Sequence, residues 1–366
     1  MTTYRINIDY EHFLFKKDYN SQAYQIFNQD FEFVFFFLNK DKSVKLQNQK
    51  NYSLEYLQFI KELGGEVPVF TAKEGLAWWG QLKDIDLERK LNSKIESFLF
   101  SLKNKQTPTY SSLISHYKEV EENVRQHSFK WVIKNPHEMS GRGNFFVQKV
   151  LDEKATFWIK SQLQQNSLIM EPWLDRIVDI GSFYNGNFFN QHIILNDQRG
   201  VFRGIKLYNH SQDLFQDPNL KNLEKVSEHI NVTQERALQW LKDQTIGSML
   251  NLEFGIDSFF YKDFEQEVSF YPWVEINFRK TMGAFAHAVK ELLPPYKVVE
   301  LHFLPVQKVL QSYVPHPDEF FYRLSPADNK KIAVYVIGAY HEEGLTNLKK
   351  KLKLDVYSSS ALDVSK

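Results

Sequence analysis

Apolar positions in the N-terminal zone follow two different patterns. Residues 31–38 are almost entirely apolar, which predicts a buried strand. Residues 53–63 carry apolar side chains at helical spacing and end at Gly64 and Gly65, which predicts an amphipathic helix. Residues 67–70 predict the next short strand. Up to about residue 80, the chain therefore predicts a small α/β layer.

Residues 84–127 follow a mostly helical pattern. Three acidic residues, Asp84, Asp86 and Glu88, stand at a predicted helix start, where they complement the helix dipole. Pro108 divides the stretch into two helices. The second carries apolar residues at helical spacing: Leu113, Tyr117, Val120 and Val124.

Strand patterns dominate from residue 129 to about residue 208. Residues 130–134 and 145–148 predict two strands joined by a glycine-containing loop, and residues 168–174 predict a third. Asn185 and Gly186 mark a hairpin between two further strands, and a last strand follows at 201–208.

The rest of the chain mixes helices and strands. Pro294 and Pro295 stop a helix there, and the basic run at 349–351 predicts a solvated helix face. The predicted elements are a helix at 233–250, paired strands at 254–262 and 268–277, a helix at 284–293, and strands at 298–303 and 332–340.

Composition narrows the class of protein. Among 366 residues, 45 Lys+Arg balance 45 Asp+Glu, which argues against a sequence-independent nucleic-acid binder. The absence of cysteine excludes disulfide scaffolds and thiolate nucleophiles. The start shows no basic-then-apolar signal pattern, and no long uncharged apolar run occurs, so we expect a cytoplasmic protein without a membrane partner. The 15% aromatic content reads mainly as core packing.

A lysine followed by glycines is the first candidate for binding chemistry. Lys134 ends a predicted strand, and the loop after it contains Ser140, Gly141, Arg142 and Gly143. An ammonium group neutralises phosphate charge, and glycines let backbone N–H groups approach phosphate oxygens closely. The alternative interpretation is an ordinary turn.

Two predicted strands bring oxygen donors together. Glu275 and Asn277 are two residues apart and so share one face of a strand. If the strand that carries Asp257 pairs with it, two carboxylates and an amide oxygen converge, a donor set that suits Mg²⁺. Arg279 continues the same face as an anion-binding fork. The alternative is the polar outer face of a half-exposed strand.

A third candidate is the strand end Glu171-Pro172-Trp173-Leu174. An acid, a kink and large apolar side chains there predict a slot for a flat base, with the backbone reading the base edge. The alternative is an edge strand ended by proline.

The order of these three signals resembles the ATP-grasp superfamily over roughly residues 85–290. The segment Glu275-Ile276-Asn277-Phe278-Arg279 is the most specific part and is similar to the metal-binding Glu-x-Asn-x-Arg of carboxylating and peptide-forming members. The resemblance implies an α/β (α+β) fold in which two α+β subdomains clasp a nucleotide. A small α/β domain would precede them.

We expect five segments from this resemblance. They are a preceding α/β domain at 1–83, a helical part of the first subdomain at 84–128, a glycine-loop subdomain at 129–175, a C-terminal subdomain with the metal site at 176–295, and an extension at 296–366.

The resemblance also implies roles for nucleotide-binding residues. Lys134, beneath the loop of Ser140, Gly141, Arg142 and Gly143, would contact the α- and β-phosphates. Lys94 resembles the second nucleotide lysine, with Arg89 as a rival. Glu171 and the backbone near Trp173 and Leu174 would meet adenine. Asp179 would bind the ribose, with Asp175 as the alternative.

Further roles concern the reacting end of the nucleotide. Lys206 would reach the γ-phosphate region, and Arg203 is nearly as plausible. Asp257, Glu275 and Asn277 would hold Mg²⁺, with Mn²⁺ as an alternative ion. Arg279 would bind an acyl phosphate or an acceptor carboxylate.

By resemblance, the activity is that of an ATP- and Mg²⁺-dependent ligase forming a C–N or C–S bond. It would activate a small-molecule or peptide carboxylate as an acyl phosphate for attack by an amine or thiol, and a homodimer is compatible with this. Asp257 stands where a Glu is usual, and Lys280-Thr281-Met282-Gly283 replaces the usual Glu-Asn-Pro-Gly, which leaves the substrate open. The alternatives are a catalytically silent nucleotide- or partner-binding relative and, less favoured, a phosphotransferase.

Overall fold

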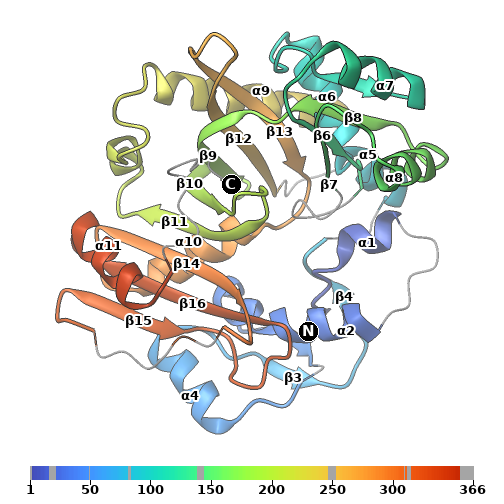
Figure 1. Ribbon diagram of the computed structural model, residues 1–366. Helices are drawn as coiled ribbons and strands as arrows, with labels where there is room; N and C mark the ends of the chain where they lie inside the picture. Colours follow the sequence, from blue (N-terminus) through green and yellow to red (C-terminus); the bar gives the residue numbers. More distant parts are fainter. Residues whose placement is uncertain are drawn as a thin grey trace.

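Three β-sheets organise the part of the chain that the structure describes (Figure 1). The computed structural model describes residues 2–15, 22–48, 50–80, 84–137, 144–245, 253–308, 310 and 315–354. One four-stranded sheet is parallel, and the other four-stranded sheet and an eight-stranded sheet are antiparallel. The predicted mixed α/β class is confirmed.

The N-terminal unit is built on the parallel sheet, in the order β3-β2-β1-β4. Its strands are β1 Thr3–Arg5, β2 Lys45–Gln47, β3 Val69–Thr71 and β4 Leu76–Ala77. Its helices are α1 Tyr10–Phe15, α2 Gln22–Phe31, α3 Phe35–Leu38 and α4 Leu54–Glu62. The predicted helix at 53–63 is confirmed, and the hydroxyl of Ser53 accepts a hydrogen bond from the Tyr56 N–H at its start.

The strand predicted at 31–38 is wrong, because these residues are helical. Helix α2 ends at Phe31, a 3₁₀ turn covers Glu32–Val34, and α3 follows. Phe33 packs on Phe285 on one side, while Phe36 packs on Phe70 on the other. A helix covered on all sides is apolar all round, so periodicity does not distinguish it from a buried strand.

The small antiparallel sheet forms a separate α+β unit with its own apolar core. Its order is β5-β8-β6-β7, with β5 Ser112–Ile114, β6 Trp131–Lys134, β7 Asn144–Val147 and β8 Leu168–Pro172. Helices α7 (Tyr117–Gln126) and α8 (Glu153–Leu163) pack on this sheet. The predicted strands near 130–134, 145–148 and 168–174 are confirmed. Leu113, predicted to be helical, lies in β5 because the helix begins only after His116.

The large antiparallel sheet has the order β13-β12-β9-β10-β11-β14-β16-β15. The hairpin predicted at Asn185 and Gly186 is confirmed and joins β9 to β10. The strands predicted at 254–262 and 268–277 are also confirmed. The tail strands join this same sheet rather than forming a sheet of their own. The bounds are β9 Asp175–Tyr184, β10 Phe189–Asn196, β11 Phe202–Tyr208, β12 Phe254–Lys262, β13 Val268–Asn277, β14 Val298–Pro305, β15 Glu319–Arg323 and β16 Ile332–Ala339.

Different elements cover the two faces of the large sheet. The N-terminal unit and α10 (Met282–Leu292) pack on the face that presents Leu207. Helices α9 (Val226–Thr245) and α11 (Glu342–Lys351) pack on the other face, which presents Ile193. In the described part of the chain, no helix is long and apolar enough to span a membrane.

Strand β13 is an edge strand, and a helix completes its hydrogen bonding. Helix α6 (Lys94–Lys103), which follows α5 (Ile85–Leu91), lies along it. The hydroxyl of Ser97 accepts from the Ile276 N–H at 2.9 Å, and the hydroxyl of Ser101 donates to the Trp273 carbonyl at 3.0 Å. Since buried backbone groups need partners, these side chains replace a neighbouring strand.

We expect Ser97→Ala to lower the free energy of unfolding by about 1–3 kcal/mol, because the buried Ile276 N–H loses its acceptor. Urea denaturation monitored by circular dichroism measures the change. Ser128→Ala, at an exposed serine, is the control and should shift stability by less than about 0.5 kcal/mol. Equal effects of the two substitutions would contradict this role of Ser97.

Two histidines, His192 of β10 and His287 of α10, lie close together where α10 packs on the large sheet. The imidazole of His192 sits so close to Gly181 and Gly283 that a Cβ on either glycine would approach the ring to less than 2.5 Å. The ring of His287 lies 5.5 Å away. Burial lowers the pKa of His192 well below its usual value, and His287 adds to this; burial and the Lys290 charge lower the pKa of His287 to about 4. Both rings are therefore neutral in the folded protein at neutral pH.

The free energy of unfolding should fall as the pH decreases from about 6.5 toward 4. In this range the histidines of the unfolded chain bind protons, whereas those of the folded protein stay neutral. At pH 5, His287 should lower the free energy of unfolding by about 2 kcal/mol. Urea midpoints at pH 7.5 and pH 5 measure it, and His287→Leu should show a smaller difference between the two. An unchanged pH dependence in that variant would refute the assignment.

Candidate active site

Acidic and basic side chains converge where β12 and β13 pair. Asp257 on β12 stands directly opposite Glu275 on β13. From α6, the Lys94 ammonium lies 2.9 Å from Glu275 Oε1. The predicted pairing of the strands that carry these carboxylates is thus observed, and Lys94 rather than Arg89 reaches them. Arg89 instead binds the Leu14 carbonyl and Asp86.

Every nitrogen of the Arg279 guanidinium already has an acceptor. Nε donates to Glu11 Oε1 at 2.7 Å, one terminal nitrogen donates to Asn277 Oδ1 at 3.0 Å, and the other donates to the Lys280 carbonyl at 3.1 Å. Glu11 also forms a close ion pair with this guanidinium. Glu11 was not predicted as a site residue, because it belongs to α1 and no sequence motif marks it.

The electrostatics of the cluster favour an additional positive charge. Burial raises the pKa of Asp257 to about 7, and Glu275 and Asp179 add to the rise against the opposing charges of Arg279 and Lys94. Within the described residues, no hydrogen bond or salt bridge holds the Asp257 carboxylate. Its charge is therefore the least compensated in the cluster.

The residues present fit a Mg²⁺ ion whose coordination is completed by phosphate oxygens. No group of three or more His, Cys, Asp or Glu side chains is arranged to hold a metal among the described residues. Asp257, Glu275 and the amide oxygen of Asn277 supply three hard oxygen donors, which is the small protein share typical of Mg²⁺ sites shared with nucleotides.

Lys134 and Glu171 form a buried ion pair on neighbouring strands of the small sheet. Glu171 also accepts a hydrogen bond at 2.9 Å from the hydroxyl of Tyr271 on β13. This contact joins the small sheet to the large one and places Lys134 at their junction. Tyr271 was not predicted, since nothing in its local sequence marks it as a partner of Glu171.

The segment after β8 forms an aromatic and cationic wall. Leu174 packs against a cluster that includes Phe259. The guanidinium of Arg176 lies 4.1 Å from the Phe259 ring centre and 5.3 Å from that of Trp173. Asp179 binds Arg176 at 2.7 Å.

A bulge in β9 explains the Arg176–Asp179 pair. The pairing with β12 shifts next to Arg176, which puts this side chain on the same face as Asp179. Asp175, the alternative ribose ligand, is exposed at the start of the strand. Asp179, two residues before Gly181 on β9, faces the same side of the sheet as Asp257.

The role predicted for Lys206 is wrong. Its strand register pairs it with Ile193, whereas Asp257 lies in the row of Gly181, His192 and Leu207. Adjacent strand residues face opposite sides, so Lys206 points away from the carboxylate cluster. Its ammonium binds Asp217 at 2.8 Å and Glu342 at 3.0 Å, on the side covered by α11.

Arg203, the alternative to Lys206, alternates with it along β11 and so belongs to the face of Leu207. Its guanidinium binds Asp197 at 2.7 Å. The four predicted loop residues Ser140, Gly141, Arg142 and Gly143 lie outside the described residues.

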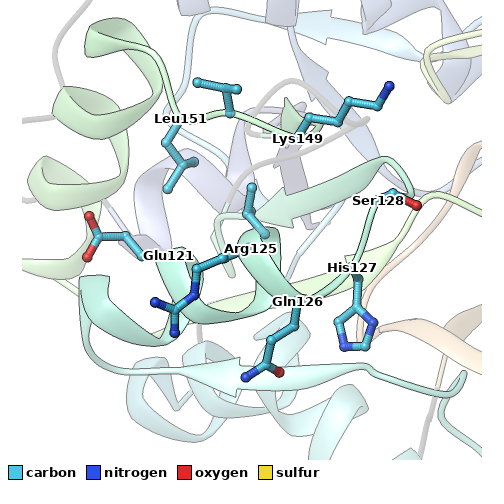
Figure 2. Close-up of a pocket in the computed structure, with 9 residues that line it drawn as sticks. Glu121, Arg125, Gln126, His127, Ser128, Lys149 and Leu151 are labelled. Carbon is cyan, nitrogen blue, oxygen red and sulfur yellow. The ribbon is translucent and has the colours of Figure 1, made fainter.

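A cavity of about 540 Å³ lies elsewhere on the small-sheet unit, at the C-terminal end of α7 (Figure 2). Figure 2 shows that the charged ends of Arg125 and Lys149 point in different directions rather than toward one another. None of its lining residues belongs to the predicted site, so we do not assign the nucleotide to this cavity.

The chain matches no protein-family model and no curated protein. Among solved structures, it is similar to N5-carboxyaminoimidazole synthetase from Staphylococcus aureus complexed with ADP, with 11% identity and a TM-score of 0.46, covering 84% of this chain and 80% of that one. It is also similar to the biotin carboxylase domain of 2-oxoglutarate carboxylase from Hydrogenobacter thermophilus, in complex with MgADP and bicarbonate, with 12% identity and a TM-score of 0.46, covering 86% and 74%. These values are too low to assign the activity of either protein to this chain.

Proposed function

We propose that this chain is an ATP-grasp ligase that uses ATP and Mg²⁺ to activate a carboxylate for attack by an amine or another nucleophile. The observation that carries the proposal is the convergence of Asp257, Glu275 and Asn277 with Lys94 at the end of two paired strands. Lys134, at the junction of the two sheets, supplies a second cation for the nucleotide.

Each phosphate-binding lysine is already held in place by a carboxylate. Lys94 is held by Glu275, and Lys134 is held by Glu171. We infer that Lys134 binds the α- and β-phosphates and Lys94 binds closer to the metal. Bound Mg²⁺ would neutralise phosphate charge and orient the transferring group.

The base and the ribose are assigned to the wall after β8. We infer that Glu171 and the backbone near Trp173 and Leu174 bind adenine, and that Asp179 binds the ribose. Arg203, on the metal-facing side of the sheet, is assigned to the γ-phosphate region.

The proposed reaction has two steps, and neither of them requires a cysteine nucleophile. A carboxylate oxygen of the substrate attacks the γ-phosphorus and ADP leaves, which forms an acyl phosphate. The amine or other nucleophile then attacks the acyl carbon, inorganic phosphate leaves, and the proton released by the nucleophile passes to the phosphate or to solvent. The protein's share is to hold the groups in line and to stabilise the developing charge.

A second candidate function is nucleotide binding without turnover. The observation that favours it is that Glu11, Asn277 and the Lys280 carbonyl already occupy most of the N–H groups of the Arg279 guanidinium, which leaves little of it for a substrate anion in this conformation.

Release of ADP from ATP and Mg²⁺, in the presence of pooled carboxylates and amines, tests the enzyme proposal. Glu275→Gln should reduce metal-dependent turnover at least 100-fold, because it removes a charged metal ligand. Glu291→Gln, at an exposed glutamate paired with Lys40, is the matched control and should leave turnover unchanged. If nucleotide stabilises the protein against heat but no mixture releases ADP, the binding-only function replaces the ligase.

Metal binding should strengthen with pH, because a proton and Mg²⁺ compete for Asp257. With a pKa of about 7, the ionised fraction of Asp257 rises roughly tenfold between pH 6 and pH 8. Titration of Mg²⁺ into the ADP complex by calorimetry measures this rise. Asp257→Asn should retain only the pH dependence of the nucleotide itself, and an equal rise in that variant would contradict the prediction.

A further inference from the structure

Helix α1 links the N-terminal unit to the candidate active site, as Figure 1 shows for its place beside α5. Contacts with both neighbouring units fix its position. The Tyr10 hydroxyl donates to Glu88 of α5, the Leu14 carbonyl accepts from Arg89 Nε at 2.8 Å, and the ring of Phe15 stacks on a small-sheet-unit histidine, His137, at 4.0 Å. The helix therefore has a defined position relative to both neighbouring units.

Glu11 of α1 is 4% exposed, and its carboxylate binds two nitrogens of Arg279. A paired guanidinium and carboxylate constrain each other in direction as well as distance. The Glu11 and neighbouring charges raise the pKa of Arg279 despite its burial, so the arginine stays charged. The orientation of Arg279 thus depends on a residue 268 positions away in the chain.

Arg279 in turn orients the side chain of Asn277, a proposed metal ligand. The nitrogen that contacts Glu11 also donates to Asn277 Oδ1 at 3.0 Å. Oδ1 is the oxygen that would face a metal ion, and a carbonyl oxygen has room for a second partner. Mutation of a side chain that holds a metal ligand in place commonly weakens metal affinity by about 10–100-fold.

We propose that Glu11 is a positioning residue that fixes Arg279 and, through it, the Asn277 oxygen at the metal site. This inference rests on the proposed function, because it concerns the Mg²⁺ that the nucleotide would bring. It assigns to the N-terminal unit a part in metal binding. Both contacts of the Glu11 carboxylate with the guanidinium are made by Oε1.

Mn²⁺ binding to the full chain, followed by the electron paramagnetic resonance signal of the free ion with and without ADP, tests this inference without measuring turnover. Glu11→Gln should weaken Mn²⁺ binding in the ADP complex about tenfold, while metal-free ADP affinity stays within twofold of wild type. Glu291→Gln is the matched control, because it removes the charge of an exposed glutamate paired with Lys40 and leaves α1 and Arg279 untouched, and it should bind Mn²⁺ as wild type does.

A double-mutant cycle separates positioning from a general loss of structure. In an Arg279→Lys background, Glu11→Gln should cause little further loss of Mn²⁺ affinity, since the pathway is already broken. If Glu11→Gln does not fold, Glu11→Asp replaces it and should show a smaller loss. An unchanged or tighter Mn²⁺ affinity in the Glu11 variants, or a full additional loss in the Arg279→Lys background, would overturn the inference. Absence of ADP-dependent Mn²⁺ binding in wild type would instead overturn the proposed function on which it rests.

Discussion

The free edge of strand β13 is the constraint on which the candidate site depends. A strand inside a sheet satisfies its N–H and C=O groups through two neighbours, but β13 has only β12. Ser97 and Ser101, on one side of α6, supply the missing hydrogen bonds. Because the same helix begins at Lys94, closing the edge also delivers an ammonium group to Glu275. The packing of α6 on β13 therefore both completes the hydrogen bonding of the strand and places Lys94 in the candidate site.

Charge in this site is organised across three separate parts of the chain. Glu11 comes from the N-terminal unit, Lys94 from α6, and Asp257 and Glu275 from the large sheet. Such a buried mixture is stable only when each charge has a partner. Asp257 is the exception: its burial, together with the charges of Glu275 and Asp179, raises its pKa to about 7.

Secondary structure was predicted correctly where the apolar pattern and the turn residues indicate the same element. The strands of Asp257 and Glu275 were predicted with the observed bounds, since alternating patterns separated by turn residues favour a hairpin. Prediction failed at residues 31–38, where burial on all sides removed the periodic signal. It also failed for Lys206, because the side of the sheet a strand residue faces depends on register with distant strands.

By itself, the sequence determined the mixed α/β class, most of the strands, and the residue types that suit a nucleotide and a divalent cation. Those properties follow from local periodicity and from the chemistry of single side chains. Only the tertiary structure decided that Lys94 rather than Arg89 meets Glu275, that Lys206 lies on the opposite face, and that Glu11 engages Arg279. Each of these depends on how segments far apart in the chain pack, and the free energy of that packing is summed over the whole core rather than encoded in any one motif.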